Sequence, residues 1–366
     1  MAADLSKEIA FASLQDFFQQ KPFVLFGTGT SCAVDSGFGM GALRDHLLKT
    51  IPTTGLTVQE QGEWDSVVDN LKAGRDLESA MDVVQSDDLI KRVVSATASL
   101  VAALDSEFGK KILAGSISWP AASLIKRLVD GLAPLDPILH VATPNYDLLA
   151  EYACEKEGIP YNTGFHGGIC RNKDWKQAEC ALMYKEIVVL GRSARGGWRL
   201  KKHARLYKVH GSLNTFKMNN TVVENNAWLY DCPGEIERLM ITPGMSKYQR
   251  LHENRVDLLG EYDRAVNEHS AFLFLGFGFN DNQLCNDAIK RKLKDQRCSG
   301  LIITRSSTPG IESFMNECEN LWLVCSSEHT GVDGTEIRNS RYGKALIIDG
   351  KHLWNTAEFT KDILGG

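Results

Sequence analysis

Three polar side chains have the chemical types and the placement of an acid–base site. Asn145 and Asp147 come shortly after the apolar run 138–142, and His210 ends the apolar run 206–210. Imidazole titrates near neutral pH and suits a general base, and an amide or a carboxylate can orient water or a hydroxyl beside it. Two other roles stay open: Asn145 or Asp147 could cap the helix that follows, and a lone histidine at a strand end can be structural.

Two glycine turns also follow apolar runs. The first is Gly27-Thr-Gly-Thr-Ser31, after residues 22–26, and the second is Gly276-Phe-Gly-Phe279, after residues 271–275. A Gly-x-Gly turn after a strand leaves backbone N–H groups bare, so a phosphate can approach closely, and a following helix adds its positive end. The third glycine of the dinucleotide fingerprint is absent, and no acidic residue ends a second strand about 20 residues on, which disfavours a dehydrogenase. Each turn could also be purely structural.

A further polar segment, Thr304-Arg305, stands at the end of the run 300–304, and Asn280 and Asp281 extend the second glycine turn. The Thr304 hydroxyl and the Arg305 guanidinium could face a ribose or a phosphate. Ligands of open α/β sheets bind at the carboxyl ends of the strands. We therefore expect these polar segments to share one edge of a sheet, although each taken alone could be structural.

The apolar runs and the helical patterns between them predict the elements that hold these residues. Several runs are unbroken, which suits parallel strands covered on both faces, and strands that alternate with helices indicate a doubly wound sheet. The fold class is therefore α/β, with a Rossmann-like, mostly parallel sheet. The expected strands are 22–26, 138–142, 206–210, 239–242, 271–275, 300–304 and 321–325, and the expected helices are 147–157, 250–268, 283–294 and 311–319.

Two stretches interrupt this alternation within what we interpret as a single domain, residues 1–366. Residues 52–135 have a helical pattern and predict an insertion, which could form a lid over the site or an oligomer interface. Residues 162–205 and 214–237 are richer in Gly, Asn, Arg and Trp, and they predict a small irregular module or long loops.

Composition excludes several classes of protein. The 366 residues are 43% hydrophobic and 24% charged, with a formal net charge of −5, which excludes disordered, collagen-like and membrane proteins. The slight acidity argues against a broadly basic nucleic-acid binder, and the basic stretch 192–208 is more simply a solvated loop, although it could meet nucleic acid or phosphates. No transmembrane helix and no signal peptide are expected.

The cysteines are odd in number and scattered, which suits reduced thiols in a cytosol better than a disulfide framework. No Cys-x-x-Cys pair exists, so neither a zinc ribbon nor any other metal site is expected. Cys32 lies beside the first glycine turn, but no activating base is evident nearby, and we interpret it as a wall residue. The nine are Cys32, Cys154, Cys170, Cys180, Cys232, Cys285, Cys298, Cys318 and Cys325.

The order of the polar segments resembles the NAD-binding motifs of the sirtuin family. The matching segments are 27–31, Thr143-Pro-Asn-Tyr-Asp147, the pair His210-Gly211 and the second glycine turn. The resemblance covers residues 20–50, 136–165, 205–213 and 238–325. It implies a Rossmann-like sheet with a small module, and NAD⁺ as a consumed co-substrate.

The resemblance also implies roles for individual residues. Asn145 would position the ribose and the attacking water, Asp147 would hold the nicotinamide end, and His210 would be the base that takes a proton from water or a ribose hydroxyl. The residues that would bind the rest of NAD⁺ are Gly27, Thr28, Gly29, Thr30, Ser31 and Thr143 near the pyrophosphate and nicotinamide ribose, and Gly276, Gly278 and Thr304 near the adenosine half.

Two departures from the deacylating sirtuins change the expected function. Residues 212–240 hold Cys232 alone where two Cys-x-x-Cys pairs would bind zinc, and the loop 37–41 lacks the proline and aspartate of the family. What remains resembles the zinc-less NAD⁺ hydrolases of bacterial anti-phage defence that pair with HerA-type ATPases, on residues 38–47 and 241–247. That resemblance implies a bacterial cytoplasmic homo-oligomer, with an ATPase ring as partner.

We therefore expect an NAD⁺ hydrolase that cleaves NAD⁺ to nicotinamide and ADP-ribose and depletes NAD⁺ during infection. Three alternatives stay open. One is an NAD-dependent protein deacylase that has lost its zinc ribbon. Another is a non-enzymatic subunit that senses NAD⁺ or ADP-ribose. The third is a generic α/β protein without NAD chemistry.

Overall fold

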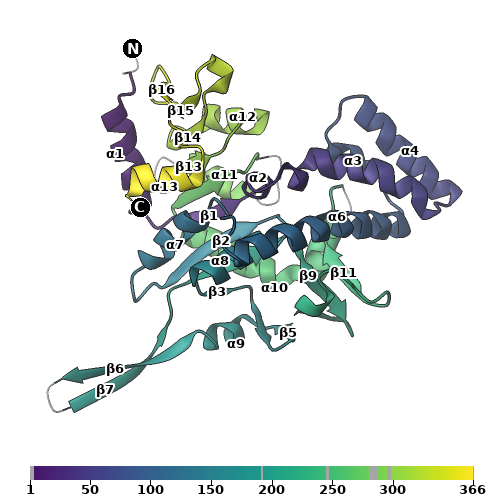
Figure 1. Ribbon diagram of the computed structural model, residues 1–366, viewed down its shortest axis with the longest axis horizontal. Coiled ribbons are helices and arrows are strands. Elements are labelled where there is room, and N and C mark those ends of the chain that lie inside the picture. The colour runs from purple at the N-terminus through teal and green to yellow at the C-terminus, as the bar shows by residue number, and fades with distance from the viewer. Residues whose placement is uncertain (1–3, 191–192, 245–246, 280–286, 295–297, 366) are drawn as a thin grey trace.

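A nine-stranded sheet forms the scaffold of the molecule (Figure 1). The computed structural model describes residues 4–190, 193–244, 247–279, 287–294 and 298–365. The strand order is β16-β15-β14-β13-β12-β1-β2-β8-β3. The bounds are β1 Phe23–Phe26, β2 Ile138–Thr143, β3 Tyr161–Asn162, β8 His203–Lys208, β12 Ala271–Leu275, β13 Ser299–Ile303, β14 Leu321–Ser326, β15 Gly334–Asn339 and β16 Leu346–Asp349.

The central strands are parallel, and the expected α/β fold class is confirmed. Strand β1 pairs in parallel with both β12 and β2, and only β15 and β16 at one edge run antiparallel to their neighbours among the described strands. All four residues of β1 are buried. Val24 and Phe26 face one hydrophobic core and Phe23 and Leu25 the other, because successive side chains of a strand point to opposite faces.

Helices cover both faces of this sheet. On one face pack α1 (Lys7–Phe18), α7 (Ala122–Asp130), α8 (Leu149–Glu157) and α13 (Thr356–Leu364). On the other face pack α10 (Lys247–Glu268), α11 (Asp287–Lys294) and α12 (Pro309–Glu317). Of the expected helix 283–294, residues 283–286 lie outside the described residues.

One expected strand belongs elsewhere. The run 239–242 contributes to β11 (Glu237–Met240), which pairs with β9 (Gly211–Met218) in a second, antiparallel sheet. Its apolar residues resemble those of a parallel strand because Leu239 and Met240 are also buried. An unbroken apolar run predicts a strand that is buried on both faces, but it does not predict which of the two sheets the strand joins.

Residues 162–205 and 214–237 are more regular than their composition suggests. The second sheet has the order β11-β9-β10-β5-β4, and β6 and β7 form a separate hairpin that extends away from the body (Figure 1). Asn219 and Asn220, both with positive φ, make the two-residue turn between β9 and β10. The bounds are β4 Phe165–Gly167, β5 Cys170–Lys173, α9 Trp175–Cys180, β6 Met183–Leu190, β7 Ser193–Leu200 and β10 Thr221–Asn225.

A helical unit with its own hydrophobic core stands beside the sheet. It is built from α3 (Met40–Thr50), α4 (Val58–Lys72), α5 (Leu77–Ala80) and the long α6 (Asp87–Leu113). It therefore begins before residue 52, and α7, the last helix of the stretch 52–135, packs on the main sheet instead. We call α3 to α6 the helical unit.

Within the described ranges no helix has both the length and the apolar character needed to cross a membrane. The cysteines in those ranges are free thiols, and Cys285 lies outside them.

Candidate functional site

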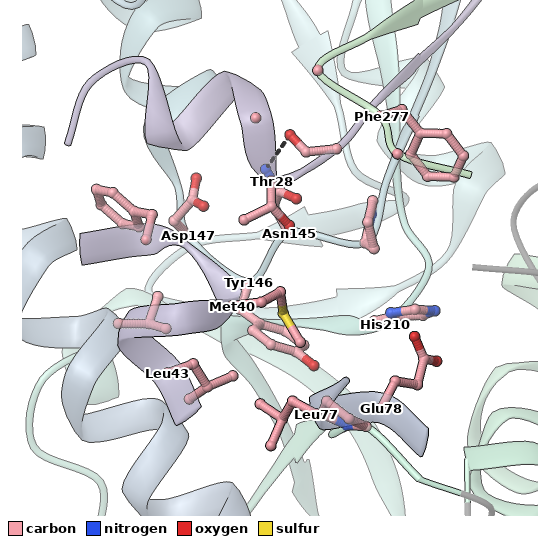
Figure 2. Close-up of a pocket in the computed structure, with 18 of the residues that line it drawn as sticks. Thr28, Met40, Leu43, Leu77, Glu78, Asn145, Tyr146, Asp147, His210 and Phe277 are labelled. Carbon is pink, nitrogen blue, oxygen red and sulfur yellow. Dashed lines mark hydrogen bonds between the residues drawn. The ribbon is translucent and has the colours of Figure 1, made fainter. Parts of the chain in front are cut away.

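A cavity of about 390 Å³ lies at the carboxyl ends of the central parallel strands, between the sheet and the helical unit (Figure 2). It brings together segments far apart in the chain, after β1, β2, β8, β12 and β13. Nine of the predicted site residues line it: Gly27, Thr28, Gly29, Asn145, Asp147, His210, Gly276, Gly278 and Thr304. Thr30, Ser31 and Thr143 lie behind this lining, where they are buried.

Asn145 is held in one orientation by its neighbours. Its Nδ2 donates to the carbonyl oxygen of Gly27 at 3.1 Å and to Oγ of Ser31 at 2.9 Å, and its backbone N–H donates to Oγ1 of Thr143 at 3.0 Å. Because a carbonyl can only accept, the amide nitrogen must face Gly27. The amide oxygen Oδ1 is buried and has no hydrogen-bond donor among the described residues.

Asp147 contacts both the helix that follows it and the first glycine turn. Its Oδ1 accepts from the backbone N–H of Leu149, the first residue of α8, at 3.2 Å, although the N-cap position itself is Leu148 and no side chain caps the helix there. Its Oδ2 accepts from Oγ of Ser31 at 2.8 Å. Ser31 thus joins Asp147 to Asn145, and its predicted part in binding is indirect: it orients two lining side chains.

His210 stands at the corner where the chain leaves the main sheet for the small one. Strand β8 ends at Lys208 and β9 begins at Gly211. Gly211 has φ +85°, a conformation that favours glycine, which explains why glycine follows the histidine. The carbonyl of His210 accepts from the N–H of Ile241 at 2.9 Å, and its side chain lines the cavity at 4% exposure.

The glycine turns contact each other, which corrects one expectation from the sequence. The N–H of Gly27 donates to the carbonyl of Leu275 and that of Gly29 to the carbonyl of Gly276, each at 3.0 Å. These two amides are therefore not bare donors for a phosphate. A Cβ on Gly29 would lie 2.7 Å from Cα and O of Gly276, so close backbone packing requires glycine here.

The second glycine turn and the end of β13 form the far side of the cavity. Gly276 has φ +52°, and the carbonyl of Gly278 accepts from Oγ1 of Thr308 at 2.7 Å. Thr304 and Thr308 present hydroxyls to the lining. Asn280 and Asp281 lie outside the described residues.

The helical unit supplies an apolar wall that sequence analysis did not assign to the site. Met40, Leu43 and Leu77 face the polar residues of the sheet edge across the cavity (Figure 2), and Leu100 and Val101 complete this wall. Their spacing gave no functional signal, because apolar residues at helical spacing are expected in a helix core. Leu77, Leu100 and Val101 lie in the predicted insertion, and Met40 and Leu43 lie in residues 38–47, which carry part of the resemblance described above.

The lining is acidic. Its titratable side chains are Asp76, Glu78, Tyr146, Asp147 and His210, and no lysine or arginine lines it among the described residues. Three carboxylates around a partly enclosed cavity favour a positively charged ligand group over a neutral one. Arg305 of the predicted polar segment is not part of this lining; its guanidinium pairs with Glu328 at 3.3 Å.

Cys32 has the properties of a structural thiol. Burial, and then the negative charges of Asp147 and Asp35, raise the pKa of its thiol above the ordinary value. A raised pKa lowers the fraction of thiolate, which is the nucleophilic form.

Within the described part of the chain, no group of three or more His, Cys, Asp or Glu side chains is placed to hold a metal ion.

Comparison with known proteins identifies a related domain. Fifty-five solved chains match, among them one from a study of the mechanism and regulation of Sir2 enzymes, with 13% identity, a TM-score of 0.41, and coverage of 85% of this chain and 90% of that one. No curated protein matches. Residues 139–317, which include Asn145, Asp147, His210 and the second glycine turn, match the SIR2-like domain family.

Proposed function

We propose that the protein uses NAD⁺ and hydrolyses it to nicotinamide and ADP-ribose. The observation that carries this proposal is the convergence of Asn145, Asp147 and His210 on one cavity at the carboxyl edge of the sheet. The match of residues 139–317 to the SIR2-like domain supports NAD⁺ as the substrate. The lack of a Cys-x-x-Cys pair anywhere in the chain favours hydrolysis over deacylation.

The charge of the cavity suits the nicotinamide half of this substrate. The nicotinamide ring of NAD⁺ is cationic, and positive charge moves to the ribose when the glycosidic bond breaks. The carboxylates of Asp76, Glu78 and Asp147 stabilise a cation at either position. The hydroxyl of Thr28 can donate to a phosphate or a ribose. The hydroxyls of Thr304 and Thr308 already donate to the carbonyls of Ser306 and Gly278, and would have to exchange these bonds to donate to the substrate.

The reaction needs one water and one base. The bond between C1′ of the ribose and the ring nitrogen breaks, its electron pair neutralises the pyridinium, and neutral nicotinamide leaves. Water adds to C1′ and gives a proton to His210. The buried Oδ1 of Asn145, which lacks a donor among the described residues, is the acceptor that orients the water or a ribose hydroxyl.

Single substitutions test this assignment. We expect Asn145→Ala and His210→Ala each to lower the rate of nicotinamide release by about 10²–10⁴-fold, the usual contribution of a positioned acid–base group. His329→Ala is the matched control, because His329 is exposed and does not line the cavity. Full activity in both site variants would contradict the proposal, and tight NAD⁺ binding without turnover would favour the sensing alternative.

A second candidate, an NAD-dependent deacylase, is favoured by one feature. The apolar wall of Met40, Leu43, Leu77, Leu100 and Val101 could accommodate an acyl chain beside the ribose. Acyl-ADP-ribose formed from an acylated peptide would identify that activity, whereas free ADP-ribose formed without peptide identifies hydrolysis.

The setting of the activity is proposed on the sequence resemblance alone. We propose that the chain forms a homo-oligomer, pairs with a HerA-type ATPase ring and depletes NAD⁺ in the bacterial cytoplasm during anti-phage defence. The mass measured by light scattering, with and without NAD⁺ and the ATPase, tests the assembly.

A further inference from the structure

Helix α5 of the helical unit is fixed at the rim of the cavity. Its N-cap Asp76 accepts from the N–H and the hydroxyl of Ser79, each at 2.9 Å. Leu77 and Ala80 are buried in the core of the helical unit. Met81, the residue that follows α5, is packed closely against Gly244, which comes after β11. A Cβ on Gly244 would lie 2.8 Å from the carbonyl oxygen of Met81. These contacts fix the backbone of α5, and with it the position of Glu78, the acidic residue within this helix.

Glu78 and His210 face each other in the cavity. Figure 2 shows the Glu78 carboxylate pointing toward the imidazole of His210. Both residues line the cavity. They come from different parts of the fold, since Glu78 belongs to the helical unit and His210 to the corner between the two sheets.

The other acidic groups in the lining have different partners. Asp147 accepts from Ser31 and Leu149, and Asp76 accepts from Ser79. Tyr146, the remaining titratable group, donates its hydroxyl to the carbonyl of Ile241. Among the carboxylates of the lining, Glu78 is the one that Figure 2 shows aimed at the imidazole.

We propose that Glu78 is a positioning residue for His210: its carboxylate orients the imidazole and stabilises the imidazolium formed when His210 takes a proton. The inference rests on the proposed NAD⁺ hydrolysis and adds to it a residue from the helical unit. In the reacting enzyme the carboxylate would accept a hydrogen bond from one ring nitrogen, while the other nitrogen takes the proton from water. The proton ends on His210.

The test compares Glu78→Gln with Asp82→Asn. Asp82 lies in the same segment, is exposed and does not line the cavity, so its substitution removes the same charge without touching the site. Two measurements are made. One is kcat and kcat/KM for nicotinamide release against pH, and the other is the titration of the His210 imidazole by NMR, with its signal identified by its loss in His210→Gln.

We expect Glu78→Gln to lower the midpoint of the His210 titration by about one pH unit, because an opposite charge within reach favours the imidazolium. The acid limb of the pH profile of kcat should also move to lower pH, and kcat itself should fall about 10-fold or more. Asp82→Asn should match the wild type in both measurements. Glu78→Asp keeps the charge and should retain part of the shift.

The NMR titration separates this inference from the proposed function. Equal His210 midpoints in wild type, Glu78→Gln and Asp82→Asn would overturn the pairing, whatever the activity. If the wild type releases no nicotinamide, the proposed hydrolysis fails, and a shifted midpoint in Glu78→Gln still supports the pair. Thermal unfolding of each variant shows whether it is folded, and Glu78→Ala, which also removes the charge, replaces Glu78→Gln in the comparison if the latter is not.

Discussion

At the scale of single residues, the site depends on contacts between backbone turns as much as on its polar side chains. The Gly27 carbonyl that receives Nδ2 of Asn145 belongs to a turn whose neighbouring amides are bonded to Leu275 and Gly276. The two glycine turns therefore fix the distance between β1 and β12 at their carboxyl ends. They position Asn145 indirectly, by placing the carbonyl that orients its amide.

This close packing predicts a large effect for Gly29→Ala. The new Cβ would lie 2.7 Å from backbone atoms of Gly276, which cannot move aside as a side-chain tip could. We expect a loss of about 1–3 kcal/mol in the free energy of unfolding, measured by urea denaturation, together with lower nicotinamide release because the Gly27 carbonyl shifts.

Gly41→Ala is the matched control for this change. Gly41 lies in helix α3, and a Cβ there would have no heavy atom within 4 Å among its neighbours. Because alanine is a better helix former than glycine, Gly41→Ala should leave the free energy of unfolding unchanged or raise it by up to about 1 kcal/mol. Equal stability of Gly29→Ala and Gly41→Ala would show that the turns are not closely interlocked.

At the scale of elements, α6 links the helical unit to the loop that carries Asn145 and Asp147. Asp105, in the second half of α6, is fully buried and accepts from the N–H of Leu148 at 2.6 Å. It also accepts from the hydroxyls of Tyr152 and Tyr230, at 2.8 and 3.2 Å. One carboxylate therefore joins the long helix, the start of α8 and the small module.

This buried carboxylate predicts a pH dependence of stability. Burial, and to a lesser extent the nearby charge of Asp147, raises the pKa of Asp105 from 3.8 to about 6. Between about pH 4 and pH 6 the folded protein holds a proton on Asp105 that the unfolded chain has released. The contribution of Asp105 to the free energy of unfolding therefore falls as pH rises through this window, by about 3 kcal/mol at about 1.4 kcal/mol per pKa unit.

Urea denaturation of the wild type and Asp105→Asn across this window measures the effect. The difference in unfolding free energy, wild type minus variant, should fall from about pH 4 to about pH 6 and then stay level. Taking the difference removes the contributions of other groups, such as Glu224, whose pKa burial raises to about 7. Tyr230→Phe, which keeps the carboxylate, should retain the pH dependence, and a pH-independent difference for Asp105→Asn would contradict the assignment.

At the scale of the whole molecule, the segments of α6 and α8 join the core of the helical unit to the core on one face of the main sheet. Ile112 of α6 packs in the core of the main sheet, whereas Leu89 and Val93 of the same helix pack in the core of the helical unit. At the start of α8, Leu148 belongs to the core of the helical unit and Leu149 to that of the main sheet. The helical unit is thus attached through shared helices, not through a flexible linker.

Such sharing predicts that the helical unit and the main sheet unfold together. Trp64 reports on the core of the helical unit and Trp119 on that of the sheet, and each is 1% exposed. With fluorotryptophan labelling, and signals assigned by Trp→Phe variants, both native resonances should disappear at the same urea concentration. Earlier loss of the Trp64 signal would show that the helical unit is an independent domain.

The sequence by itself determined the parallel scaffold and most of the polar residues at its edge. Apolar runs followed by Asn145, His210 and the glycine turns predicted strands with polar ends, and parallel strands necessarily bring those ends to one side of a sheet. Strand identity and the alternation with helices are local properties, which hydrophobic patterning encodes directly. That is why nine predicted site residues line a single cavity.

Tertiary structure alone decided the rest of the site. The apolar wall and Glu78 come from the helical unit, whose position over the sheet depends on long-range packing of α6 against α8 and on the Asp105 contacts. The partners of the Gly27 and Gly29 amides likewise lie about 250 residues away in the chain, at Leu275 and Gly276. No local pattern encodes such contacts, because both partners satisfy ordinary helix or turn preferences until the chain folds and brings them together.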